Sequence, residues 1–62
     1  MNKAEKLVKR IAEENKNLNR GEIMHQVYDA VQKKIGKTED GFYHYPPEYD
    51  KALRELEYKL GF

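Results

Sequence analysis

Apolar residues recur at the three- and four-residue spacing of a helix in three separate stretches of this chain. Such spacing lines apolar side chains along one side of each helix, and that side must be buried against another element. Polar segments containing Asn, Gly or Pro separate the three stretches. The pattern therefore predicts an all-α fold with helices over residues 3–14, 19–35 and 47–60, forming a single domain over residues 1–62.

Capping residues mark the expected helix ends. Asn2 and Asn19 each precede an apolar stripe, and a glutamate follows three residues after each of them, as in a capping box. Gly36 follows the last apolar residue of the second helix, where a glycine commonly ends a helix, and Pro47 suits the first turn of the third. These signals favour a small three-helix bundle. The alternative is a helical hairpin with the third helix packed across it, completed by a second copy.

The second stretch has an apolar face wider than a single neighbour requires. Its apolar positions cover roughly 160° of the helix surface, against the ~100° of an ordinary amphipathic stripe. We therefore expect this helix to contact two neighbours, and a homodimer is one way to supply the second. The residues concerned are Ile23, Met24, Val27, Tyr28, Ala30, Val31 and Ile35.

The segment over residues 37–46 is rich in aromatic side chains. Asp40-Gly41 is a turn signal, and the four residues after it have β-propensity. The segment is therefore either an ordered loop or a short hairpin, and the polar residues before Asp40 make a poor partner strand. If the loop closes the end of the bundle, Phe42 and Tyr49 belong to the core, with Tyr43 and Tyr45 half exposed.

Some of these aromatic residues are also candidates for binding a partner. Tyrosine and histidine are amphipathic, and aromatic side chains are enriched at the energetic centres of protein interfaces. Tyr58 lies opposite the apolar stripe of the third helix, on a face that is otherwise charged. The predicted partner-binding residues are Phe42, Tyr43, His44, Tyr45 and Tyr58.

Charge and hydropathy narrow the class of partner. The 12 basic and 11 acidic side chains give a net charge of +1, without the basic excess typical of a dedicated nucleic-acid binder. No apolar run approaches the ~20 residues of a membrane span, and the first residues do not resemble a signal peptide. We expect a cytoplasmic protein that does not bind membranes. A run of cations on the first helix is either a solubilising face or a patch for an acidic partner or phosphate; it comprises Lys3, Lys6, Lys9 and Arg10.

The residues that usually carry catalysis or bind metals are scarce. The sequence contains neither cysteine nor serine, and its four glycines are isolated. His25 and His44 have no metal-ligand spacing. The carboxylates occur in polar surroundings, whereas acid–base catalysis needs a pocket that shifts pKa values. The sequence therefore predicts no catalytic residue, no cofactor and no metal, and hence a protein that is not an enzyme.

The leading hypothesis is a protein-binding module, a small regulator, inhibitor or adaptor that occupies the surface of a partner protein. Tiny cysteine-free helical proteins of this style are common among phage and mobile-element products. The alternative is a DNA-binding helix-turn-helix regulator with helix 19–35 as its recognition helix. Two features count against the DNA-binding alternative. The turn between the two helices lacks the usual glycine, and acidic side chains lie on the face that would contact DNA. That face would carry Arg20, His25, Gln26 and Asp29.

Overall fold

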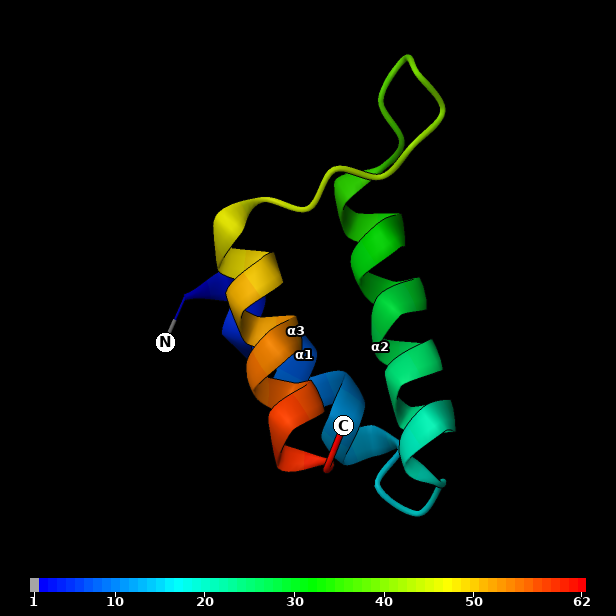
Figure 1. The fold of residues 1–62 in the computed structure, drawn as a ribbon, viewed down its shortest axis with the longest axis vertical. Coiled ribbons are helices and arrows are strands. Elements are labelled where there is room, and N and C mark those ends of the chain that lie inside the picture. The colour runs from blue at the N-terminus through cyan, green and yellow to red at the C-terminus, as the bar shows by residue number, and fades with distance from the viewer. Residues whose placement is uncertain (1) are drawn as a thin grey trace.

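A computed structural model describes residues 2–62 as three helices: α1 (Lys3–Glu14), α2 (Arg20–Ile35) and α3 (Pro47–Lys59). α1 and α3 run in the same direction, and α2 runs the opposite way (Figure 1). All regular secondary structure in the described part of the chain is helical, so the predicted all-α three-helix bundle is confirmed. The helix bounds match the predicted ranges to within one residue.

The asparagine caps form as the sequence predicts. The Asn2 side chain accepts a hydrogen bond from the backbone N–H of Glu5 at 2.8 Å. Asn19 accepts one from the backbone N–H of Glu22 at 2.9 Å, and helix α2 begins at the residue after it. Gly36 ends α2 with a φ of 74°, a value that residues with a side chain rarely adopt. Local features of the sequence therefore set the starts of α1 and α2 and the end of α2.

The end of α3 is closed by a Schellman motif and tied to the start of α2. Gly61 has a φ of 87°, and the N–H of Phe62 donates to the carbonyl of Glu57 at 2.9 Å while that of Gly61 donates to Tyr58 at 3.1 Å. Arg20 Nη1 donates to the Gly61 carbonyl at 3.0 Å, and its guanidinium lies 4.9 Å from the centre of the Phe62 ring. Arg20 thus links two helix ends that lie 41 residues apart in the sequence.

The core lies mainly where α1 packs against both other helices, while α2 and α3 touch each other much less. Val27 and Val31 of α2 have no exposed surface. The half-buried members of the wide α2 face, among them Tyr28, extend the core toward α3 and the aromatic segment. The expectation that α2 has two neighbours is confirmed within a single chain. The buried core residues are Ala4, Val8, Ile23, Met24, Val27, Val31, Tyr49, Ala52 and Leu53.

A polar and aromatic seam joins α2 to α3. The Tyr28 hydroxyl donates to the carboxylate of Glu57 at 3.2 Å, and the Tyr28 ring packs edge-on against Tyr45 with 5.9 Å between centroids. Gln32 Nε2 donates to the Tyr45 hydroxyl at 3.0 Å. Burial, reinforced by the nearby Glu57 carboxylate, raises the pKa of Tyr28 above its ordinary value. The last part of the aromatic segment is therefore anchored to the bundle.

Candidate functional site

Residues 38–44, here called the 38–44 turn, project beyond the end of α2 (Figure 1). The N–H of Thr38 donates to the Phe42 carbonyl at 3.1 Å, and the N–H of Gly41 donates to the Thr38 carbonyl at 3.0 Å. Gly41 has a φ of 84°, which the tight reversal requires. No residue of this segment is in a strand, so it is the ordered loop of the two predicted alternatives and not the hairpin.

The Asp40 carboxylate organises this turn. Asp40 Oδ1 accepts a hydrogen bond from the backbone N–H of Phe42 at 2.9 Å, and Oδ2 lies 2.8 Å from Nε2 of His44. The Thr38 hydroxyl also hydrogen-bonds to Asp40 and lies 3.1 Å from the Phe42 carbonyl oxygen. The bond from Thr38, followed by those from Phe42 and His44, lowers the pKa of Asp40. A single ionised side chain thus fixes the conformation of an exposed loop.

The aromatic residues of this segment fall into two groups. Phe42 is 68% exposed, and His44 is also exposed. Tyr43 is half-buried with the Lys37 ammonium group 5.6 Å from its ring centre, and Tyr45 is half-buried against α2. The expectation of a half-exposed Tyr43 and Tyr45 is confirmed.

The expectation that this segment closes the end of the bundle holds for Tyr49 and fails for Phe42. Tyr49 is buried in the core, as predicted, but the placement of Phe42 in the core is wrong. The physical reason is local: the N–H of Phe42 donates to the Asp40 carboxylate, and the Thr38 hydroxyl donates to the Phe42 carbonyl. These two hydrogen bonds hold Phe42 in a turn that stands off the bundle.

The structure separates Tyr58 from the other predicted binding residues. Tyr58 is 84% exposed and lies in the last turn of α3. Because α3 starts near the 38–44 turn and runs away from it, Tyr58 lies toward the other end of the bundle (Figure 1). The five predicted residues therefore belong to two surfaces: four in the aromatic segment, and Tyr58 on α3.

The cations of the first helix also divide between two surfaces. Lys3, Lys6 and Arg10 line a depression that has Leu7 and Tyr49 in its wall, and Lys34 of α2 adds a fourth cation. None of these four cations forms an ion pair within 4.0 Å among residues 2–62. Sequence reasoning missed Lys34, because only the packing of α2 against α1 brings it beside the cations of α1. We call this surface the basic depression.

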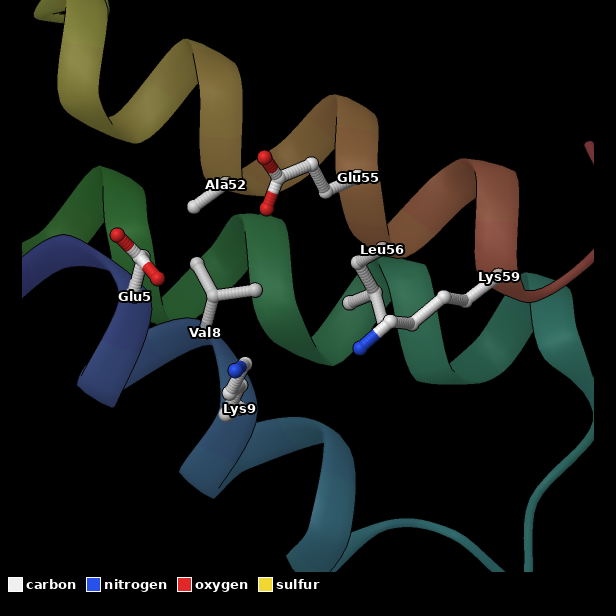
Figure 2. Close-up of a pocket in the computed structure, with 7 residues that line it drawn as sticks. All are labelled: Glu5, Val8, Lys9, Ala52, Glu55, Leu56 and Lys59. Carbon is white, nitrogen blue, oxygen red and sulfur yellow. The ribbon is translucent and has the colours of Figure 1, made fainter. Parts of the chain in front are cut away.

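Lys9 lies on a different surface, a shallow groove between α1 and α3 (Figure 2). Glu55 and Lys59 stand four residues apart on α3 but form no ion pair with each other, whereas Asp50 and Arg54, at the same spacing, pair at 3.1 Å. We call this surface the α1–α3 groove. Its floor is Val8, Ala52 and Leu56, and its rim is Glu5, Lys9, Glu55 and Lys59.

The residues of the helix-turn-helix hypothesis do not form a basic face. Arg20 is engaged by the end of α3, as described above. Asp29 is paired with Lys33 at 3.1 Å, so a carboxylate stays on the face that would approach phosphates. The four cations of the basic depression lie elsewhere, on α1 and the end of α2.

Two further properties of residues 2–62 bear on the site. The described part of the chain contains no group of three or more His, Asp or Glu side chains arranged to hold a metal ion. None of its helices is both long and apolar enough to cross a membrane.

No known family, characterised protein or solved structure matches this chain.

Proposed function

We propose that this chain is a small protein-binding module that acts as a regulator, inhibitor or adaptor, and that the 38–44 turn makes the contact. The observation that supports it is the combination of a hydrogen-bonded turn with a phenylalanine, 68% exposed, at the point where the turn closes. A loop already held in its binding conformation loses little entropy on association. An exposed ring on such a loop is suited to fill an apolar pocket of a partner.

The residues around Phe42 have separate roles in this proposal. Tyr43 and His44 flank the phenylalanine and supply an amphipathic ring and a polar ring to the rim of the contact. Tyr45 holds the turn in position through Gln32 and Tyr28. Asp40 keeps the turn rigid through its bonds to Thr38, Phe42 and His44.

The test is a pull-down with the tagged chain from a lysate of the source cells, run with and without nuclease. We expect capture of a discrete protein that survives nuclease and is lost with Phe42→Ala. Phe62→Ala is the matched control, because it removes a similarly exposed phenylalanine, 58% exposed, at the opposite end of the molecule. Asp40→Ala should weaken capture about tenfold while leaving the Phe42 ring in place, since it removes only the preorganisation of the turn.

Two outcomes would count against this function. Full capture by Phe42→Ala would show that the turn is not the contact. Loss of all capture on nuclease treatment would favour the DNA-binding alternative, and a duplex-binding assay over a range of salt concentrations would then follow.

A further inference from the structure

The basic depression gathers positive charge from two helices at one place. Lys3, Lys6 and Arg10 follow one another at three- and four-residue spacing on α1, so they lie along a single face of that helix. Lys34 reaches the same depression from the last turn of α2. Four cations therefore line the depression, and no carboxylate of residues 2–62 does.

The described part of the chain supplies no counter-charge to these cations. None of the four forms an ion pair within residues 2–62, whereas Lys33, the neighbour of Lys34 on α2, pairs with Asp29 at 3.1 Å. Like charges gathered in one place repel one another and oppose folding. An anionic group of a binding partner would supply the compensation that the fold itself does not.

The wall and the size of the depression favour a short acidic peptide segment over nucleic acid. Leu7 and Tyr49 form an apolar wall beside the cations, which an apolar side chain set among carboxylates would contact and a phosphate backbone would not. The volume of about 350 Å³ lies at the lower end of the ~300–1,000 Å³ typical of ligand pockets, which is room for a few side chains. A net charge of +1 also gives the chain little long-range attraction for a long polyanion.

The basic depression lies toward the same end of the molecule as the 38–44 turn (Figure 1). Lys34 is in the last turn of α2, and the 38–44 turn begins four residues after it. Lys3 starts α1 and Tyr49 is in the first turn of α3, and both helices begin toward that end. A partner protein that contacts the turn is therefore within reach of the depression, and two linked contacts bind more tightly than either alone.

We propose that the basic depression binds an acidic segment of the partner protein, in which carboxylates flank an apolar side chain; this inference rests on the function proposed for the 38–44 turn. The carboxylates pair with the cations of α1 and with Lys34, and the apolar side chain contacts Leu7. Charge pairs at the edge of an interface mainly speed association and make it dependent on salt. The turn then supplies the apolar anchor, and the depression supplies the electrostatic steering.

The probe for the experiment is the blocked peptide Glu-Glu-Leu-Glu-Glu, whose carboxylates match the cations of the depression in number. It is titrated into the isotopically labelled intact chain, and the NMR shifts of the backbone amides report both affinity and location. We expect shifts concentrated at residues 3–10 and around Lys34, with a dissociation constant of about 1 mM at low salt. Binding should weaken about tenfold near 0.15 M salt, and about threefold when serine replaces the leucine of the peptide.

Two pairs of variants separate the position of the charges from the net charge. Lys6→Gln combined with Arg10→Gln should weaken peptide binding about tenfold, because it removes two of the four cations. Its control, Lys16→Gln combined with Lys33→Gln, changes the net charge equally and should leave the affinity within about twofold. Lys34→Gln should weaken binding about threefold, and Lys33→Gln, one residue earlier on the same helix, should not. Urea unfolding shows that each variant is folded before it is compared.

Several outcomes would overturn the proposal. They are the absence of saturable peptide binding at low salt, shifts that map to another surface, and binding that is indifferent to both Lys6→Gln with Arg10→Gln and Lys34→Gln. Tighter binding of tripolyphosphate, or of an oligothymidylate of the same charge as the peptide, would assign the depression to a phosphate-bearing ligand instead.

The same peptide distinguishes this inference from the function proposed for the 38–44 turn. Phe42→Ala should bind the peptide as the unaltered chain does, because Phe42 lies outside the depression. Loss of partner capture by Phe42→Ala without any peptide binding would retain the turn as the contact and remove the depression. Peptide binding together with full partner capture by Phe42→Ala would place the contact at the depression alone.

Discussion

At the scale of single residues, Tyr28 shows how a side chain on the edge of the core gains a partner. Its hydroxyl lies at the α2–α3 seam, half-buried, and donates to the Glu57 carboxylate at 3.2 Å. Burial is the largest cause of its raised pKa, and the charge of Glu57 adds to it. Both effects favour the neutral, hydrogen-donating form of the phenol in the folded chain.

Replacement of Tyr28 by Phe keeps the ring contact with Tyr45 and removes the bond to Glu57. We expect Tyr28→Phe to lower the free energy of unfolding by about 0.5–1 kcal/mol at neutral pH. Because the folded pKa of Tyr28 lies above its unfolded value, its contribution is complete below the unfolded pKa near 10. It is lost as pH rises through the folded pKa, so the two proteins should converge in alkaline solution.

Urea unfolding monitored by circular dichroism, repeated at pH 7 and at several alkaline values, measures this difference. Tyr58→Phe is a suitable control, because that hydroxyl lies on a side chain that is 84% exposed. A Tyr28→Phe deficit that stays constant across the alkaline range would show that the hydrogen bond to Glu57 is not its source.

Residue identity alone could not assign the roles of Phe42 and Tyr45. Both stand in one aromatic run, and the sequence marks the run without distinguishing its members. The exposure of each ring depends on a different hydrogen-bond partner. The backbone of Phe42 is held by Asp40, two residues earlier, whereas the Tyr45 hydroxyl bonds to Gln32, 13 residues earlier. The first partner was visible as a turn signal, but the second depends on how the segment folds back on α2.

At the scale of helices, the sequence predicted most where the relevant hydrogen bonds are local. Each asparagine cap and the N–H that it binds are three residues apart, so their geometry follows from the sequence directly. Ion pairs between side chains four residues apart were harder to predict, although they are equally local. Asp50 and Arg54 pair as their spacing predicts, but Glu55 and Lys59, with identical spacing, line the α1–α3 groove.

The cap of α2 makes a direct test of such local control. We expect Asn19→Ala to lower the free energy of unfolding by about 1 kcal/mol, because the N–H of Glu22 loses its partner at the helix start. Asn17→Ala, two residues earlier in the exposed connection, is the matched control and should change stability by less than about 0.5 kcal/mol. Urea unfolding of both variants measures the difference, and equal losses would argue against a specific capping role.

At the scale of the whole molecule, the sequence predicted that apolar faces would meet but not which polar side chains would gather around them. Helical periodicity fixes the face on which a residue lies and leaves open how neighbouring helices are rotated. Lys34 illustrates this limit, since it joins Lys3, Lys6 and Arg10 only because the end of α2 lies beside the start of α1. The balanced total charge of +1 therefore conceals a cluster of four cations.

Cations gathered without a counter-charge repel one another, and this repulsion should cost the folded chain stability. Lys6→Gln combined with Arg10→Gln removes two of the four while keeping side chains of similar helix propensity. We expect this double variant to unfold at higher urea, with a gain of about 0.5 kcal/mol at low salt. The gain should disappear near 1 M salt, where the screening length falls to about 3 Å.

Lys16→Gln combined with Lys33→Gln is the matched control, because it alters the net charge equally. It removes cations that have partners: Lys16 pairs with Glu13 at 2.9 Å and Lys33 with Asp29 at 3.1 Å. These pairs are exposed, so their loss should leave stability unchanged or slightly lower. If both double variants shift stability alike, net charge is the cause; if only the first is stabilised, the position of the charges in the basic depression is what matters.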